Sequence, residues 1–426
     1  MAHVVTAFCR NGTDVLLVRR SDAVGTYAGR WGGISGYVEG DTGDPLDDAR
    51  REVREETGID PASLTLVRRG DPIAVDDAEG AFTVHPFLFD CTTRTVTPNE
   101  ELVETEWVQP TAMLDRETVP RLWETYRAVG PTVETVTSDR THGSSYVSIR
   151  ALEVLRDEAA SLSASRSAAE SDVDDDWDRL AEVARTLRGA RPGMTALATR
   201  VNRVLAEADR TAVAVRDRAI RAVVDAATAD DRAARAAVRE LAGDDGPTAV
   251  LTLSRSETVA TALATLDGPI FVAESAPGGE GRNVAASLAA EAEREVTLLP
   301  DSAVASLLAE GRVDAALVGA DAVLADGSVA NKVGTRTLAL VAADADVPVY
   351  VVTARDKVAP TEEFHPEQAA FDAPAGVETY APLFDRTHAD GVTVVTEDGP
   401  LDAEACREVA ERHRRLAAWD DDDGKE

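Results

Sequence analysis

The sequence is poor in lysine and aromatic residues, and it has no long apolar run. Of its 44 basic residues only Lys332, Lys357 and Lys425 are lysines, and aromatic side chains make up 4% of the 426 residues. No apolar stretch approaches the ~20 residues of a membrane-spanning helix. The first residues, MAHVVTAFCRNG, lack a basic region followed by an apolar core and are read as a strand, not an export signal. We therefore expect a cytoplasmic protein without a membrane segment.

Cysteine is scarce as well. Cys9, Cys91 and Cys406 form no C-x-x-C pair, and the six histidines are scattered along the chain. This spacing argues against a disulfide framework and against thiolate zinc sites.

Positive charge is the other shortage, because 77 acidic residues face 44 basic ones and the net charge is −33. The lack of basic patches argues against direct nucleic-acid binding. An acidic, alanine-rich, lysine-poor chain resembles proteins of extreme halophiles, where a Debye length of ~3 Å or less screens repulsion between carboxylates. The acidic runs DVDDDWD (172–178) and DDDDGKE (420–426) are predicted to be solvated surface.

Three regions and a tail are expected from the pattern of apolar residues. Residues 1–132 alternate strand-like runs (HVVTAF, DVLLVRR, FTVHPFLFDC) with glycine-rich loops and one strong helix. Residues 133–245 have helical spacing, interrupted by the acidic stretch. Residues 246–416 alternate short apolar strands with helices, which predicts a parallel, doubly wound α/β sheet. Residues 417–426 are expected to form an acidic tail.

The strong helix of the first region carries a cluster of carboxylates. Asp44 can cap it, Pro45 suits its first position and Gly58 suits its end. Glu52, Glu55 and Glu56 stand at i, i+3 and i+4, so they project from one face. That arrangement suits Mg²⁺ or Mn²⁺, which a phosphate substrate would also coordinate. The alternative is an ordinary surface helix of an acidic protein.

The segments GYVEG and RREVREETGI resemble the Nudix box, G-x5-E-x7-R-E-U-x-E-E-x-G-U, where U is aliphatic. The resemblance implies an α/β/α Nudix sandwich over residues 1–132. It also implies that Glu52, Glu55 and Glu56 hold the metal beside Gly36, the opening glycine of the box. Arg51 would orient the carboxylates while water attacks a nucleoside diphosphate linked to another moiety.

One departure from the box concerns its spacing. The interval from Gly36 to Arg51 is one residue longer than usual, and Thr42 or Gly43 stands where the first glutamate is expected. Asp41 and Asp44 are nearby carboxylates. Further metal or base ligands are expected among three glutamates that the sequence does not rank: Glu100, Glu101 and Glu104.

The two internal lysines mark a second site. Lys332 and Lys357 lie in GADAVLADGSVANKVGT and YVVTARDKVAP. A chain that otherwise uses arginine has kept two compact ammonium groups, which serve phosphates as point charges. The segment also opens an expected helix, whose free amides form an anion site. The candidate phosphate ligands are Asn331, Lys332, Gly334, Thr335 and Lys357.

Residues 135–416 resemble the family of initiation factor 2B α/β/δ subunits, methylthioribose-1-phosphate isomerase and ribose-1,5-bisphosphate isomerase. The resemblance rests on GARPGMTALATRVNRVL, with Arg191 and Pro192 as its arginine-proline motif, and on VGADAVLADGSVANKVGT. It implies a helical subdomain (133–245), a Rossmann-like domain (246–416), and assembly as dimers or larger oligomers.

The resemblance also bears on isomerase activity. Asp321 matches an aspartate that carries proton transfer in the isomerases, but Ser254 stands in the place of their cysteine. A hydroxyl is a poor proton carrier without an activating base. Ala276 replaces an expected phosphate-clamping arginine, although Gly281 and Arg282 remain. TLSRSET is closer to the T-H-x-x-S segment of the regulatory subunits, so these differences favour ligand sensing over isomerisation.

The sequence thus predicts a fusion and leaves three functions open. The first is Mg²⁺-dependent pyrophosphohydrolysis of a nucleoside diphosphate derivative, with a phosphorylated sugar or nucleotide bound at the second site. The second is a non-enzymatic binding protein related to translation initiation factor 2B. The third is an aldose–ketose isomerase of the ribose-1,5-bisphosphate type in nucleotide salvage.

Overall fold

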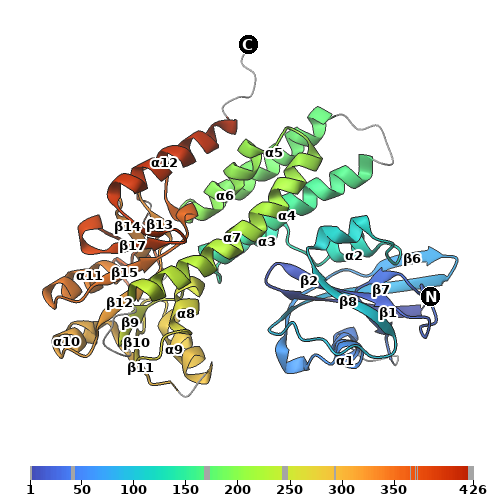
Figure 1. Cartoon of the computed structure of the whole chain (residues 1–426), viewed down its shortest axis with the longest axis horizontal. Helices are drawn as coiled ribbons and strands as arrows, with labels where there is room; N and C mark the ends of the chain where they lie inside the picture. The colour runs from blue at the N-terminus through green and yellow to red at the C-terminus, as the bar shows by residue number, and fades with distance from the viewer. Residues whose placement is uncertain are drawn as a thin grey trace, which may run out of the picture. The chain divides into compact units, whose positions relative to one another are not determined.

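The computed structural model describes residues 2–39, 44–166, 173–241, 248–291, 294–364, 366–369, 371 and 373–420 (Figure 1). These residues form two compact units. The first takes the described residues within 1–132 and 156–172, and the second takes those within 133–155 and 173–426. None of the helices in the described ranges combines the length and apolarity that a bilayer crossing would require.

The first unit is built on a mixed sheet in the order β3-β2-β1-β7-β5, with β4, β6 and β8 attached to β1, β7 and β2. Its strands are β1 (Ala2–Asn11), β2 (Asp14–Arg20), β3 (Trp31–Gly32), β4 (Ile34–Tyr37), β5 (Leu64–Arg69), β6 (Ile73–Asp77), β7 (Gly80–Cys91) and β8 (Leu102–Val108). β1 and β7 run parallel, and the neighbouring pairs run antiparallel. The strands expected at HVVTAF, DVLLVRR and FTVHPFLFDC are confirmed.

Helices cover both faces of this sheet. They are α1 (Pro45–Thr57) and α2 (Leu122–Arg127), with short 3-10 turns η1 (Pro61–Ser63) and η2 (Pro110–Asp115). Val53 of α1 belongs to the same core as Val5 and Ala7 of β1, whereas Leu122 of α2 belongs to the core of Phe8. Successive residues of a strand point to opposite faces. The expected α/β/α sandwich is therefore confirmed.

The second unit begins with helices, as expected for residues 133–245. They are α3 (Val133–Ser138), α4 (Ser144–Arg166), α5 (Val173–Gly189), α6 (Thr195–Glu207) and α7 (Ala212–Leu241). Of α4, only the part up to Leu155 belongs to this unit. The acidic run 172–178 was expected to interrupt these helices. From Val173 onward it instead forms the first turn and a half of α5. Asp176 and Trp177 are buried there, at 4% and 6% exposure, so the expectation of solvated surface is wrong for these two. The helical turn places both on the inner face.

A doubly wound sheet follows, in the order β11-β10-β9-β12-β15-β17-β18. Its strands are β9 (Val250–Leu253), β10 (Ile270–Ala273), β11 (Val296–Leu299), β12 (Ala315–Val318), β15 (Val349–Val352), β17 (Thr393–Thr396) and β18 (Gly399–Leu401). The strands are parallel from β11 to β17, and β18 is antiparallel. The chain order reverses between β9 and β12, where ligands of open α/β sheets bind at the carboxyl ends of the strands.

Helices cover both faces of this second sheet. They are α8 (Glu257–Leu263), α9 (Glu280–Glu291), α10 (Val304–Ala309), α11 (Thr335–Asp344) and α12 (Ala403–Ala417), with 3-10 turns η3 (Asp301–Ala303), η4 (Arg355–Lys357), η5 (Ala389–Gly391) and η6 (Ala418–Asp420). α7, α8 and α9 share one core, and α10, α11 and α12 share the other. The parallel, doubly wound fold is confirmed.

The C-terminal tail is ordered further than its charge predicts. In η6, Asp420 pairs with Arg185 at 2.6 Å, and the Trp419 indole N–H donates to Asn202 Oδ1 at 2.9 Å. The tail expected from residue 417 is therefore structured as far as Asp420, because two arginines and an amide of the helical part engage it. Residues 421–426 lie outside the described residues.

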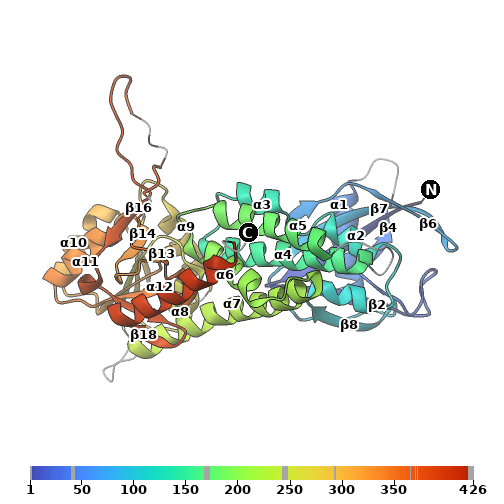
Figure 2. The ribbon, with the colours of Figure 1, turned by 90° about the horizontal axis from the view of Figure 1, so that it is seen from above.

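A small antiparallel sheet was not anticipated. Its strands are β13 (Ala322–Val323), β14 (Val329–Lys332) and β16 (Phe384–Thr387). Between η4 and β16 the chain leaves the body of the unit as a long arm, which Figure 2 shows rising above the helices. Asn331 and Lys332 consequently end a strand, and α11 begins three residues later at Thr335.

Candidate functional sites

The carboxylate helix α1 is held as its sequence predicts. Asp44 caps it by accepting the Leu46 N–H at 3.2 Å, and Gly58 ends it with a left-handed φ of 70°. Asp44 also pairs with Arg69 at 2.9 Å, so its carboxylate is engaged by the cap and by an arginine. Asp41, Thr42 and Gly43, the positions around the extra residue of the box, lie outside the described residues.

Glu56 and Glu52 project from α1 toward β4. Glu56 is 3% exposed and accepts the Ser35 N–H at 3.3 Å. Burial, reinforced by the charge of Glu52, raises the pKa of Glu56 to about 8. Burial also raises the pKa of Glu52. These two carboxylates repel one another in a partly desolvated place, which is the condition that a bound cation relieves.

Only glycine fits at position 36, beside the Glu52 carboxylate. A Cβ added to it would lie 2.0 Å from Cδ of Glu52, far inside van der Waals contact. The opening glycine of the box therefore makes room for the Glu52 carboxylate.

Arg51 is surrounded by carboxylates. Its guanidinium contacts Asp48 at 2.5 Å and Glu52 at 2.8 Å, and it lies 3.9 Å from Glu55. Asp48 is buried and also accepts the Glu39 N–H at 3.3 Å. Arg51 thus stands where the resemblance implies an orienting residue.

The donor set suits a hard cation, although no preformed cluster stands ready. Among the described residues, no three His, Cys, Asp or Glu side chains are grouped closely enough to hold a metal ion. The Glu55 carboxylate points outward and its side chain is 59% exposed, whereas Glu52 and Glu56 face inward. The chemistry of the carboxylates fits Mg²⁺ or Mn²⁺.

A cavity of about 410 Å³ opens beside these carboxylates. Glu52, Glu55 and Glu101 line it, together with Arg20 and Tyr27. Of the three further candidates, Glu101 is the one placed at the cavity, and its charge contributes to the raised pKa of both Glu52 and Glu56. Glu104 instead pairs with Arg19 at 3.5 Å on the surface.

The second candidate site lies at the carboxyl ends of β9 and β12. A cavity of about 50 Å³ is lined there by Ser254, Asp321, Asn331 and Lys357, together with Gly143 and the first residues of α4, Ser144–Tyr146. The sequence analysis missed this segment, although the start of a helix is a usual place for backbone amides to face a ligand. Asp321 also lines a neighbouring cavity of about 200 Å³ beside Pro192 and His413.

Asp321 is the most deeply buried acid of this site. Burial raises its pKa, while the charges of Lys357, Arg191 and Lys332 act in the opposite direction. The Lys357 ammonium donates to the Ala320 carbonyl at 2.8 Å, and burial lowers the pKa of Lys357. The charges of three cations therefore act on one carboxyl group, which is a suitable setting for a phosphate.

The other predicted phosphate ligands are engaged elsewhere. Arg191 donates to the Asp139 carbonyl at 2.6 Å, and Lys332 pairs with Glu280 at 2.8 Å. Arg282 pairs with Glu274 and its side chain is 64% exposed. Gly281 is needed for close packing, because a Cβ there would lie 1.9 Å from the Ala273 carbonyl oxygen.

The N-terminus of α11, expected to bind a phosphate, already binds a carboxylate of the chain itself. The Asp385 carboxylate accepts the N–H groups of Gly334 at 2.8 Å and of Arg336 at 3.1 Å. Thr335 donates its hydroxyl to the Lys332 carbonyl and accepts from the Asn331 amide. The prediction of a free anion site at Gly334 and Thr335 is therefore wrong, because β16 brings an aspartate to that helix end.

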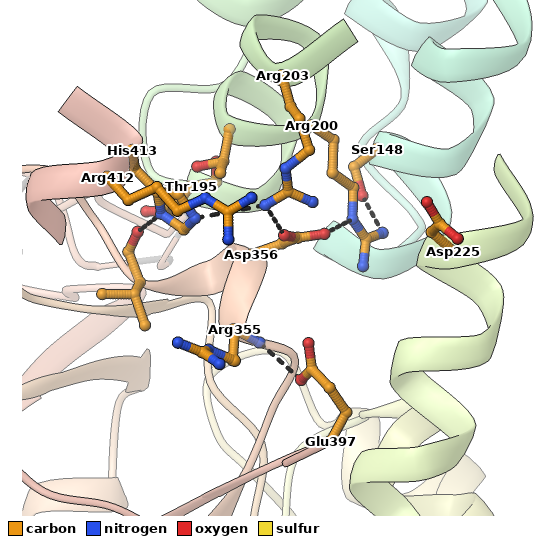
Figure 3. A network of polar contacts seen from close by, with 12 residues as sticks. Ser148, Thr195, Arg200, Arg203, Asp225, Arg355, Asp356, Glu397, Arg412 and His413 are labelled. Carbon is orange, nitrogen blue, oxygen red and sulfur yellow. Dashed lines mark hydrogen bonds and ion pairs between the residues drawn. The ribbon is translucent and has the colours of Figure 1, made fainter. Parts of the chain in front are cut away.

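A buried ionic network supports the loop of Lys357 (Figure 3). Asp356 accepts from Arg200 at 3.0 Å and from Arg203 at 2.5 Å, and Arg200 also donates to Ser148 Oγ at 2.8 Å. The His413 Nδ1 lies 2.7 Å from the Val358 carbonyl. α4, α6 and α12 thereby fix η4, which carries Lys357 to the site.

Comparison with known proteins was made for both units. The chain matches the model of the Initiation factor 2 subunit family over residues 140–403 and that of the NUDIX domain over residues 2–129. A methylthioribose-1-phosphate isomerase of Gemmatimonas aurantiaca is 35% identical over 231 residues, 49% of this chain and 67% of the relative. A 5-deoxyribose 1-phosphate isomerase of Clostridium botulinum is 32% identical over 145 residues, 30% of this chain and 42% of the relative.

A solved structure shares the fold. Translation initiation factor eIF-2B of Pyrococcus horikoshii OT3 superimposes with a TM-score of 0.53 at 23% identity, over 63% of this chain and 94% of that one. The predicted resemblances to Nudix and initiation factor 2B proteins are thereby confirmed, and the NUDIX domain indicates a hydrolase.

Proposed function

We propose two activities for this chain, which belongs to the Initiation factor 2 subunit family and carries a NUDIX domain ahead of that module. The first is divalent-cation-dependent hydrolysis of a nucleoside diphosphate linked to another moiety. The observation that carries it is the carboxylate face of α1: Glu52 and Glu55 line a cavity of about 410 Å³, and Glu56 is buried on the same helix. The matching half of the Nudix box supports the same reading.

Each residue of the box has a part in this reaction. Mg²⁺ or Mn²⁺ would be held by Glu52, Glu55 and Glu56, and it would lower the pKa of a water molecule and balance phosphate charge. Gly36 leaves space for the Glu52 carboxylate. Arg51 keeps Glu52 in place, and it limits repulsion within the cluster through its contact with Asp48.

The test is an assay of cleavage with and without Mg²⁺, in molar KCl, on a panel of nucleoside diphosphate derivatives. Glu55→Gln and Glu56→Gln should each lower kcat by at least about a hundredfold, the scale of losing a general base or a metal ligand. Asp47→Asn, which removes an exposed carboxylate from the same helix, should leave turnover unchanged. Equal turnover in all three variants would refute the hydrolase.

The second activity belongs to the initiation-factor-like module. We propose that it binds a phosphorylated pentose at the ends of β9 and β12, with Lys357, Lys332 and Arg191 as the cations near Asp321. The names of the two isomerase relatives favour a sugar 1-phosphate and raise isomerisation above the sensing role that the sequence favoured. The cavity there is small, about 50 Å³.

Isomerisation would need a proton carrier, and Asp321 is the candidate. Its raised pKa suits a group that holds and returns a proton, whereas the Ser254 hydroxyl does not. NMR of 5-methylthioribose 1-phosphate, 5-deoxyribose 1-phosphate and ribose 1,5-bisphosphate incubated with the protein tests this. Conversion that Asp321→Asn abolishes supports the isomerase, and binding without conversion supports the sensor. Neither binding nor conversion would remove both roles.

A further inference from the structure

The cavity of the first unit has an apolar lining that the Nudix box does not explain. It is formed by apolar and aromatic side chains from β1, β6 and β7, from the loop between β2 and β3, and from the segment before α2. They are Val4, Val75, Phe82, Val84, Val119 and Tyr27. The Tyr27 and Phe82 rings lie 6.3 Å apart between centroids, with an interplanar angle of 57°. Such a wall suits a planar ring more than a sugar or an inositol.

Arg20 lines the same cavity as the carboxylates and these rings. Its Nε donates to the Thr26 carbonyl at 3.0 Å. The charge of Arg20 acts to lower the pKa of Glu56 and that of Tyr27. In both residues burial has the larger effect, in the opposite direction. Within the described residues, Arg20 makes no ion pair, in a chain with 77 acidic residues. An unpaired guanidinium beside a carboxylate cluster is suited to a phosphate.

The loop that carries these groups is fixed, and part of it is strained. Tyr27 has a left-handed φ of 53°, and its hydroxyl donates to the Asp77 carboxylate at 2.9 Å. Ser21 binds the loop to the turn of Glu101, with its amide donating to the Glu101 carbonyl at 2.7 Å. Strain in a non-glycine residue persists where the surroundings impose it, which is common at ligand sites.

We propose that Arg20 binds the diphosphate of the substrate and that Tyr27 and Phe82 hold its aromatic base. This inference rests on the proposed hydrolase, and it adds that the cavity selects nucleoside diphosphates against aliphatic or purely inorganic ones. The phosphates lie between Arg20 and the carboxylates of α1, and the base lies against the ring wall. No bond is made or broken by Arg20, Tyr27 or Phe82, so all three act in binding.

Calorimetric titration of the full-length protein in KCl, without a divalent cation, tests this apart from turnover. The probes are ADP, inorganic pyrophosphate and dimethylallyl diphosphate. ADP should bind at least about tenfold more tightly than the other two. Arg20→Gln should weaken ADP binding about ten- to a hundredfold, the scale of a hydrogen bond to a charged group. Arg54→Gln, which removes an exposed arginine of α1, is the matched control.

The ring wall is tested separately. Phe82→Leu keeps an apolar side chain and should remove most of the preference for ADP over pyrophosphate, while Arg20→Gln should weaken both ligands. Equal affinity for ADP and pyrophosphate in the parent protein, or equal behaviour of Arg20→Gln and Arg54→Gln, would overturn the proposal. If ADP binds as described but no nucleoside diphosphate derivative is cleaved, the hydrolase fails while this assignment stands.

Discussion

At the residue scale, the first site depends on the absence of a Cβ atom at Gly36, which would displace the Glu52 carboxylate. The motif names Gly36 only as the start of the box, whereas the structure shows that its missing Cβ is the space in which the Glu52 carboxylate lies. Glu56 is buried beside Ser35 of the same strand, and its pKa is raised to about 8. The glutamates of the box therefore lie in different environments, although the motif treats them alike.

Gly36→Ala should therefore impair the first site without unfolding the chain. The methyl group pushes the Glu52 carboxylate away, and the affinity for Mg²⁺ should fall at least about tenfold, as for displaced metal ligands. Gly189→Ala is the control, because a Cβ there meets nothing within 4 Å. Titration of both variants with Mn²⁺, followed by electron paramagnetic resonance, measures the effect. Unchanged affinity in Gly36→Ala would contradict the role given to Glu52.

At the element scale, the second unit is organised by buried charge between helices and the loop of η4. Asp356 lies between Arg200 and Arg203 of α6, and their charges hold the pKa of that carboxyl well below its usual range despite burial. His413 of α12 is 4% exposed and lies beside Arg203. A buried charge whose partner is removed is costly, so this network fixes the position of Lys357.

His413 gives the network a measurable pH dependence. Burial, with Arg203 and Arg412 nearby, lowers its pKa to about 4. Between about 4 and 6.5 the unfolded chain binds a proton at this residue that the folded chain does not. This residue therefore leaves stability unchanged above about pH 6.5, and protonation of the unfolded chain destabilises the fold as the pH falls toward 4, by about 3 kcal/mol.

Urea unfolding between pH 4 and 7, at fixed KCl concentration, checks this. The stability of His413→Asn should depend less steeply on pH than that of the parent protein, whereas His388→Asn, at an exposed position, should follow the parent. Carboxyl groups titrate in the parent protein and in His413→Asn alike, so the contribution of His413 is the difference between their two slopes of stability against pH. Parallel curves for the parent and His413→Asn would contradict the assignment.

At the scale of the whole molecule, charge dominates. The net charge of −33 is spread over a chain with only three lysines. Arginines meet many of the acids in pairs such as Arg203 with Asp356, and the remainder repel one another. Origin in a halophile stays a prediction, and the physics behind it is testable: repulsion between exposed carboxylates falls as the Debye length shrinks.

Raising KCl from 0.1 M to 2 M should accordingly raise the Tm by roughly 10 °C or more, on the order of a few kcal/mol for a chain of this kind. The gain should shrink at pH 5, where part of the carboxylates is protonated. Differential scanning calorimetry at both pH values measures it. A Tm that is independent of KCl at pH 7 would exclude adaptation to salt.

Assembly also stays a prediction. The arm before β16 exposes Phe371 and Tyr380, at 59% and 87%, which is unusual for large apolar side chains at a surface. We expect a dimer or larger homo-oligomer. Size-exclusion chromatography with light scattering in 2 M KCl should give at least twice the mass of one chain. A monomer over the micromolar range would contradict it.

The sequence by itself determined many of the elements and the two families. Periodicity, caps and turn residues act locally, so α1 with Asp44 and Gly58, three strands of the first sheet, the strand–helix alternation of the second and the glutamates of the box could be read. Only the tertiary structure decided which polar groups meet. Asp385 reaches the start of α11 from β16, and Glu101 and Arg20 reach the same cavity. These contacts join residues far apart in the chain, and burial, which sets their charge and partners, is a property of the packed molecule.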